Sequence, residues 1–510
     1  MRMGSLGAAA VLALAAASTA LAAPGPAPAS ASASAGPDPA KDARSRPHPE
    51  AKHAEEPQAA PPPDSPAPDD FAPCDDAETA PALTGSLCAR FQAPLSPENP
   101  DLGQVELFVR KFPAEGRAKG QAWLIAGGPG ESGASLYPFL DPLRTAFAGY
   151  DLIVPDHRGS GLSTRLCPDQ EAADSPGGYA LEGKEAAACL ALVQAKGARA
   201  QAFTISNAAR DLSALMARYK GGGRTVLYGV SYGTQLVLRT LVVAPPAKLD
   251  AVVLDSLAPP EGDNDWDVSH RPAIADAVGR KVLAECDAWA DCHTQLGGSA
   301  LKTAEWVASD PKRAAAFPDR KPKPFLGALL DDPEARTLIP DVVVGARDGK
   351  PEAIDKAKAR LEAVDQRLAA YPQARLSVPL AALIDASEND ARPDLTRKQA
   401  DAETKDLIFT ASAPGWLAGW AAGAYPRDDV FGKTPAKLPP TLVLQGDLDA
   451  RTPYEGAMAR LDQLKGAGKV SLVTVKGGAN GLLMTQPDCF TASVGLFIDK
   501  RRAPPATCGG

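Results

Sequence analysis

Histidine is scarce in this 510-residue sequence and is absent from its C-terminal part: the chain has 5 histidines, and none follows His293. A basic excess is lacking too, because 54 Lys and Arg stand against 62 Asp and Glu, for a net charge of −8. Such a chain has no basic surface to neutralise phosphates, so nucleic acid is not expected as a partner. After the N-terminal segment, no stretch approaches 18 apolar residues, which excludes a membrane-spanning helix there.

The N-terminal segment has the parts of a secretory signal peptide. Arg2 gives it a charged start, an Ala/Leu run follows, and the small residues of Ala20-Leu21-Ala22 suit a cleavage site. No cysteine precedes Cys74, which excludes a lipid-modified cysteine at that site. We therefore expect residues 1–22 to direct export, to the periplasm or outside the cell, without stable membrane insertion. Residues 23–70 are rich in Pro and Ala and have almost no large apolar side chains, so we expect a disordered linker.

The eight cysteines are even in number, which indicates disulfides in an exported protein. They fall into four couples that are close in sequence, and short loops close most easily. A zinc site is the alternative, but paired Cys-x-x-Cys spacing and nearby histidines are missing. The favoured pairs are Cys74 with Cys88, Cys167 with Cys189, Cys286 with Cys292, and Cys489 with Cys508.

Short apolar runs alternate with helical patterns in two parts of the chain, residues 71–262 and 430–510. This alternation predicts an α/β fold with a mostly parallel sheet and helices on both faces. Residues 263–429 have a helical pattern instead, and we interpret them as a cap domain inserted between two strands. The expected strands are 105–112, 121–126, 150–155, 225–228, 251–255, 441–445 and 470–475, and the expected helices of the sheet domain include 206–219, 454–464 and 490–498.

Residues 229–233 read Gly-Val-Ser-Tyr-Gly, between an apolar run and a helical pattern. This is the Gly-x-Ser-x-Gly pattern of a nucleophile elbow, a tight strand-to-helix turn that holds a serine in a strained conformation. Side chains at Gly229 and Gly233 would collide with the strand and the helix. An ordinary glycine turn is the alternative interpretation of five residues alone. We predict that Ser231 is the nucleophile.

Two other segments at expected strand ends fit serine chemistry. Residues 127–133, Gly-Gly-Pro-Gly-Glu-Ser-Gly, can bring backbone N–H groups close to a ligand. A phosphate-binding loop is the usual alternative, but it is not expected here because no Lys-Ser/Thr follows. Asp449 stands just after the expected strand 441–445, where an acid that orients a catalytic histidine belongs in the chain order Ser, Asp, His. A helix-capping or turn aspartate is the alternative.

Together with Asp-x-Arg-Gly-x-Gly-x-Ser at 156–163 and Asp-x-x-Thr-Pro at 449–453, these segments resemble the tripeptidyl-aminopeptidase and prolyl-iminopeptidase-like α/β-hydrolases. The resemblance covers residues 71–262 and 430–510. It implies the α/β-hydrolase fold and a secreted serine peptidase that removes short pieces from peptide N-termini. It also implies Ser231 as nucleophile, Asp449 as acid, and the backbone N–H groups of Tyr232 and Gly128 as oxyanion donors. No cofactor or metal is expected.

The sequence departs from this family where the family carries Gly-x-Gly-His-Gly after the last strand. Residues 477–481 read Gly-Gly-Ala-Asn-Gly, so Asn480 occupies the histidine position. An amide has no basic nitrogen and cannot take the serine proton. In the serine protease subtilisin, removal of the base histidine costs about 10⁶-fold in turnover. A similar loss here would leave very little activity.

Four residues are candidates to replace the histidine as a base. His157 follows an expected strand and could swing toward Ser231, but it would lack Asp449 as its partner. His270 and His293 lie in the predicted cap and are more typical of surface or structural histidines. Lys476 ends a strand and is expected to face solvent.

Three functions are compatible with these residues. The first is an exported, aminopeptidase-like serine hydrolase of low activity. The second is a catalytically inactive relative that binds peptides or small esters, and the third is a secreted esterase, because fold does not fix substrate. The acids Glu261, Asp263, Asp265 and Asp267 could hold a substrate ammonium group, but acidic clusters are more often solvated faces.

Overall fold

The computed structural model describes residues 70–179, 181, 184–411, 417–419, 423–499 and 502–509. The predicted signal peptide, and the predicted linker up to residue 69, lie outside these residues. Within the described residues, one ten-stranded sheet has the order β1-β2-β3-β5-β4-β6-β7-β8-β9-β10. The strands are β1 (Ala72–Pro73), β2 (Leu87–Pro94), β3 (Gln104–Phe112), β4 (Gly120–Ile125), β5 (Asp151–Pro155), β6 (Arg224–Val230), β7 (Ala251–Asp255), β8 (Thr441–Gly446), β9 (Val470–Lys476) and β10 (Thr507–Gly509).

The sheet is mostly parallel, as the sequence predicts. β5, β4, β6, β7, β8, β9 and β10 pair in parallel, and β1, β2 and β3 form an antiparallel edge. Parallel register places Ile125 at the end of β4 opposite Gly229 in β6. The glycine-rich loop after β4 and the elbow after β6 therefore leave the sheet side by side, at its carboxyl edge.

Each face of the sheet has its own apolar core because side chains alternate along a strand. Trp123 and Ile125 of β4 point to one core, with helices α4, α5 and α16, while Ala122 and Leu124 point to the other, with α1, α17 and α18. These helices are α1 (Leu140–Ala146), α4 (Ile205–Arg218), α5 (Tyr232–Val243), α16 (Tyr454–Leu464), α17 (Leu482–Thr485) and α18 (Pro487–Asp499).

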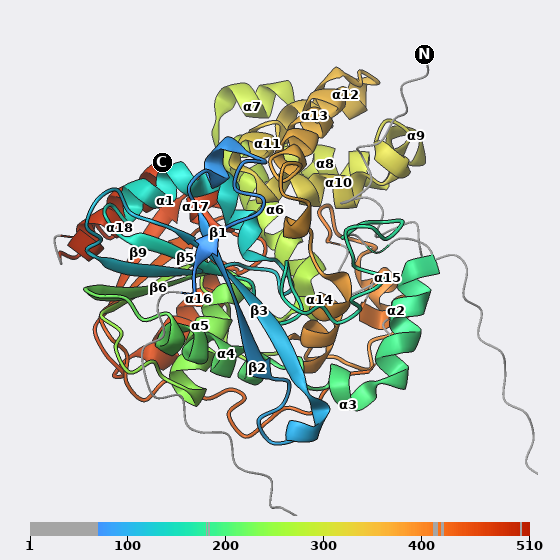
Figure 1. The fold of residues 1–510 in the computed structure, drawn as a ribbon. Helices are drawn as coiled ribbons and strands as arrows, with labels where there is room; N and C mark the ends of the chain where they lie inside the picture. Colours follow the sequence, from blue (N-terminus) through green and yellow to red (C-terminus); the bar gives the residue numbers. More distant parts are fainter. Residues whose placement is uncertain are drawn as a thin grey trace, which may run out of the picture.

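Helices α6–α15 lie between β7 and β8 in the chain (Figure 1). Most of them share a separate apolar core, and Leu448 and Ala450, on either side of Asp449, belong to it. The residue boundaries of the predicted cap, 263–429, stay a prediction. The helices are α6 (Arg271–Ala288), α7 (Ala290–Gln295), α8 (Ala300–Ser309), α9 (Pro311–Ala314), α10 (Pro322–Ala328), α11 (Pro333–Thr337), α12 (Ile339–Asp348), α13 (Glu352–Gln366), α14 (Val378–Ile384) and α15 (Arg397–Glu403).

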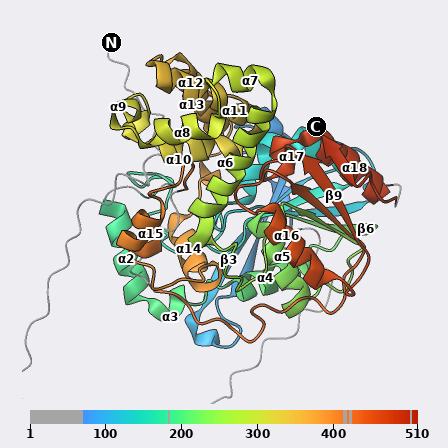
Figure 2. The ribbon, with the colours of Figure 1, turned by 180° about the vertical axis from the view of Figure 1, so that it is seen from behind.

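Helix α14 differs from the rest of this insertion, because Leu380, Leu383 and Ile384 belong to the core of the sheet domain. In both views it lies apart from α7–α13, close to α15 and α2 (Lys184–Ala195) (Figure 2). A Cβ on Gly130 would lie 2.7 Å from the Ser377 carbonyl oxygen, just before α14. The helix therefore covers the glycine-rich loop at contact distance.

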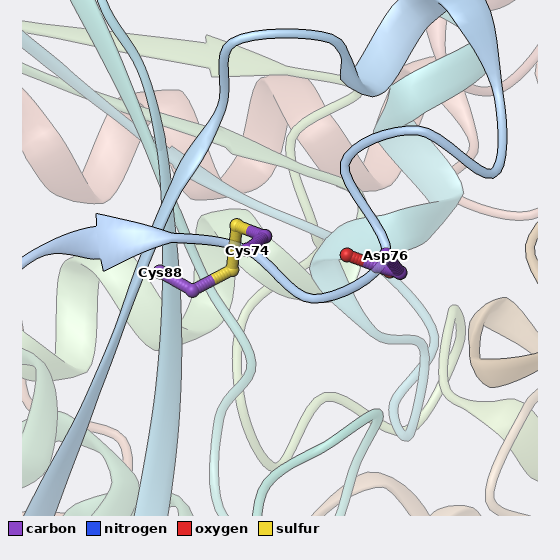
Figure 3. A group of neighbouring side chains, drawn as sticks. All are labelled: Cys74, Asp76 and Cys88. Carbon is purple, nitrogen blue, oxygen red and sulfur yellow. A yellow bond between two sulfur atoms is a disulfide. The ribbon is translucent and has the colours of Figure 1, made fainter.

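All four predicted disulfides are present: Cys74–Cys88, Cys167–Cys189, Cys286–Cys292 and Cys489–Cys508. Cys74 and Cys88 lie beside Asp76 in a group with the spacing of metal ligands (Figure 3). Their sulfurs are bonded to each other and offer no thiolate, and Asp76 forms an ion pair with Arg110. This group is therefore a structural clasp between β1 and β2.

Among the described residues, no helix combines the length and the apolar character that crossing a membrane requires.

Candidate active site

Ser231 occupies a strained turn between β6 and α5. Its φ of 54° and ψ of −122° lie in a region that side-chain-bearing residues rarely adopt. A Cβ on Gly229 would lie 2.4 Å from the Gly233 carbonyl oxygen, and one on Gly233 would lie 2.5 Å from that of Ala126. Only glycine fits at these two positions, because the strand, the turn and the loop after β4 touch there through their backbones.

One corner of the chain, Asp255-Ser256 at the end of β7, holds both the serine and the loop that follows β9. The Asp255 carbonyl accepts the Ser231 N–H at 2.9 Å, and the Ser256 hydroxyl accepts the Gly481 N–H at 2.8 Å. The Asp255 carboxylate accepts the N–H groups of Leu482 and Leu483, at 2.8 and 3.0 Å. Burial raises the pKa of Asp255 to about 6, although the N–H donors favour the ionised carboxylate and act in the opposite direction. Asn480 is thereby placed on the same corner as Ser231.

Asp449 is buried and accepts a dense set of hydrogen bonds. One oxygen accepts the backbone N–H groups of Arg451 and Thr452 at 2.7 and 2.8 Å. The other accepts the Thr452 hydroxyl at 2.7 Å, the Gln445 amide at 3.4 Å and the Asn480 amide at 3.1 Å. Burial nevertheless raises the pKa of Asp449 above its usual range. Asp449 thus faces the residue at the family's histidine position.

Asn480 makes the bond to Asp449 that the Nδ1–H of a histidine makes in a serine triad. Its amide nitrogen also donates to the Thr452 hydroxyl at 2.9 Å, so both amide hydrogens are engaged. The remaining group is an amide oxygen, which accepts hydrogen bonds but does not take a proton near neutral pH. Asp449 is therefore hydrogen-bonded to an amide instead of an imidazole, and Asn480 cannot serve as the base for Ser231.

The predicted oxyanion donors, Tyr232 and Gly128, directly follow Ser231 and its spatial neighbour Gly127, respectively, in the chain. Tyr232 is the first residue of α5, where a backbone N–H points out of the helix and the helix dipole favours negative charge. Gly128 has a φ of 113°, and a Cβ on Gly127 would lie 3.4 Å from the Ser231 Cβ. Their roles as donors stay a prediction.

His157 is buried rather than free to swing. Its Nδ1 lies 2.9 Å from the Arg158 carbonyl oxygen, and its ring packs against that of Tyr232, with centroids 5.7 Å apart. Burial lowers its pKa to about 4, so the ring is neutral near pH 7. Reaching Ser231 as a base would mean leaving this packing.

The other three proposed replacements have partners elsewhere. His270 pairs with Asp267, and His293 is exposed and lies 3.1 Å from Asp287. Lys476 faces solvent, as the sequence predicts, and its ammonium lies 3.0 Å from Asp447. None of these contacts involves Ser231.

Of the four acids singled out as ammonium ligands, Glu261, Asp263 and Asp267 make internal contacts, whereas Asp265 is exposed. Glu261 and Glu388 both pair with the buried Arg239 of α5, at 2.8 and 2.6 Å. Asp263 accepts the backbone N–H of Asp265 at 2.7 Å. Glu261, which precedes the insertion, and Glu388, within it, are thereby tied to α5, the helix that follows Ser231.

The comparisons with known proteins agree with this geometry. The alpha/beta hydrolase fold family matches residues 124–290, and the TAP-like protein family matches residues 414–508. Serine protease Hip1 of Mycobacterium tuberculosis is 24% identical over 462 residues, with 83% of this chain and 86% of the relative covered. Tripeptidyl aminopeptidase of Streptomyces coelicolor is 27% identical over 469 residues, with 81% and 80% covered.

The fold, the elbow and the matched families define the protein as an α/β-hydrolase of the serine type. More narrowly, the chain is similar to α/β-hydrolase serine peptidases, because its C-terminal part matches the TAP-like family and its relatives include the two peptidases above. The sequence singled out Ser231 at the elbow and Asp449 as the acid, and these two roles stay predictions; the Asp255-Ser256 corner was missed. In the sequence, this corner is marked only by two polar residues at the end of a strand, a pattern too common to indicate a site.

Proposed function

We propose that the protein is an exported serine hydrolase that cleaves short peptides near their N-termini through an acyl-enzyme on Ser231. The observation that carries this proposal is the strained elbow, whose serine side chain makes no capping hydrogen bond to α5. Backbone strain of this kind costs of order 1–3 kcal/mol and is found where function needs it. The relatives named as peptidases support a peptide substrate.

In the proposed reaction, the Ser231 oxygen attacks the peptide carbonyl, and the backbone N–H groups of Gly128 and Tyr232 hold the resulting oxyanion. In this proposal Asp449 and Asn480 line the site, since Gly481, next to Asn480, and Ser231 are held by the same Asp255-Ser256 corner. Export is supported by the four disulfides, which form and persist in oxidising compartments.

The test is a peptide hydrolysis assay read by mass spectrometry. Peptides with free and with acetylated N-termini are incubated with the wild-type protein and with Ser231→Ala. We expect short N-terminal pieces to be released from the free peptides alone, and only by the wild-type protein. Equal cleavage of acetylated peptides would contradict the aminopeptidase assignment, and cleavage of esters alone would favour an esterase.

A binding protein without turnover is the second candidate, and Asn480 is the observation that favours it. Its amide nitrogen donates to Asp449 and to Thr452, so both amide hydrogens have partners, and an amide offers no base to Ser231. Calorimetric titration with product-like peptides distinguishes the two functions. Binding of these peptides by the wild-type protein, together with no cleavage of the corresponding longer substrate peptides, would support the binder and exclude the hydrolase.

A further inference from the structure

The glycine-rich loop carries one ionisable side chain, Glu131, that the serine chemistry described so far does not use. The turn at residues 128–130 is tight: a Cβ on Gly128 would lie 2.7 Å from the Glu131 backbone nitrogen. The chain therefore folds back at Glu131, whose side chain is half-buried. This brings its carboxylate over the start of its own loop.

The position in front of Gly127 is bordered by both this carboxylate and the nucleophile. A Cβ on Gly127 would lie 3.3 Å from Glu131 Oε2 and 3.4 Å from the Ser231 Cβ. The carboxylate oxygen and the serine side chain thus border the same small space in front of Gly127. The two distances limit the separation between Glu131 Oε2 and the Ser231 Cβ to about 6.7 Å. Within that limit, the carboxylate and the serine hydroxyl can be joined by a direct hydrogen bond or by one water molecule.

The surroundings suit a carboxylate that takes and returns a proton. Burial raises the pKa of Glu131 above its ordinary value of 4.5, while the positive charge of Arg451 and the Gly127 N–H keep the ionised form accessible. Arg451 itself is held 2.8 Å from Asp331 of the insertion. A base with a raised pKa accepts a proton more readily than an exposed carboxylate does.

We propose that Glu131 is the general base of this protein, taking the Ser231 hydroxyl proton directly or through one water. This inference rests on the proposed function, because it supplies the base that Asn480 lacks. The Ser231 oxygen bonds to the substrate carbonyl carbon, its proton passes to Glu131, and the carbonyl electrons form the oxyanion. When the C–N bond breaks, Glu131 returns the proton to the leaving amine. The oxygen of a water molecule then bonds to the acyl carbon while Glu131 takes the water proton. The bond between the acyl carbon and the Ser231 oxygen breaks, and Glu131 returns the proton to that oxygen, which releases the carboxylic acid product and restores the serine.

The experiment measures the rate at which a fluorophosphonate labels Ser231, by intact mass, in the folded full-length protein. In labelling, the serine oxygen bonds to phosphorus, fluoride leaves and the serine proton must go to a base. We expect Glu131→Gln to lower this rate by at least about 10²-fold, the usual contribution of a general base. The probe carries no ammonium, so this loss cannot reflect a lost contact to a peptide N-terminus. Glu455→Gln, an exposed change on α16, is the matched control and should label like the wild type.

A double variant separates a base from a residue that only shapes the loop. If Glu131 is the base, Glu131→Gln combined with Asn480→His labels as fast as Asn480→His alone, because the imidazole replaces it. If Asn480→His alone labels faster than the wild type but the double variant does not recover that rate, Glu131 has a structural role and the inference is overturned. A Glu131→Gln variant that labels at the wild-type rate would overturn it while leaving the serine hydrolase intact. A wild-type protein that does not label while Asn480→His does would reject both the inference and the hydrolase.

Discussion

Replacing Asn480 by histidine should complete a triad in place. The amide nitrogen lies 3.1 Å from the Asp449 carboxylate, so an imidazole Nδ1–H at this position donates to the same oxygen. The bond to the Thr452 hydroxyl is lost, which costs about 0.5–1.5 kcal/mol, but Thr452 keeps its 2.7 Å bond to Asp449 and is not left unpaired. We therefore expect the free energy of unfolding to change by no more than about 1.5 kcal/mol.

The gain is expected in the labelling rate of Ser231. With Glu131→Gln as the background, in which the proposed base is absent, the histidine should add the usual contribution of a positioned general base, about 10²–10⁴-fold or about 2.7–5.5 kcal/mol. Relative to the wild type, in which Glu131 acts as the base, the gain should be smaller. Because Asp449 favours the protonated imidazole, the pKa of the new histidine should lie above about 6.5, and labelling should rise as the pH passes through it. The wild-type rate, which depends on a carboxylate, should level off at lower pH.

The assay is fluorophosphonate labelling over the acidic to mildly basic pH range, followed by intact mass. Asn480→Gln, an amide without a basic nitrogen, is the matched control, and Ser231→Ala added to Asn480→His gives the blank. A folded Asn480→His protein whose rate and pH profile equal those of the wild type would refute the reasoning. It would mean that the side chain at position 480 faces Asp449 without reaching the serine.

Two further changes test the packing and the electrostatics. Gly233→Ala should cost about 1–3 kcal/mol and abolish labelling, because its Cβ would lie 2.5 Å from a backbone oxygen, whereas Gly495→Ala, with nothing within 4 Å in α18, should gain about 0.5–1 kcal/mol. Urea unfolding with the disulfides intact measures both, and equal effects would contradict the glycine argument. Burial raises the pKa of Asp156 to about 6, so the folded state prefers its protonated form. Its contribution to stability is then present below about pH 4, the unfolded pKa, and lost as the pH rises through the folded pKa of about 6. The stability of the wild type relative to Asp156→Asn should accordingly fall by up to about 3 kcal/mol between about pH 4 and 7, and a constant difference would refute the shift.

The central strands could be predicted because parallel strands buried on both faces are short apolar runs. The strand predicted at 251–255 and the helix predicted at 454–464 coincide with β7 and α16. β2 and β10 were missed, since strands at or near an edge carry polar side chains and lack such a run. Helix α14 was assigned to the cap by its place in the chain, but chain order does not state which apolar core a helix joins.

The candidate site was predicted where its signal is local and missed where it is not. The elbow is five adjacent residues whose glycines have steric reasons to be there. The Ser256–Gly481 hydrogen bond joins residues 225 positions apart, and neither residue has a distinctive neighbour pattern. Glu131 belongs to the glycine-rich segment 127–133, which the sequence analysis considered only as a source of backbone N–H groups. The position of its carboxylate over Gly127 depends on the folded turn and could not be predicted from the sequence.

The energetics of the two predicted catalytic residues differ in what they imply. Asp449 accepts five hydrogen bonds, so its burial is compensated within the fold and says little about chemistry. Ser231 has the opposite balance: its backbone is held at a φ of 54°, while its side chain does not cap the helix that it precedes. Backbone strain at a residue whose side chain does not cap the following helix points to a role in ligand binding or in a reaction. The serine, rather than the acid, is therefore the stronger argument for retained chemistry, and a base that acts on it has to come from a neighbour such as Glu131.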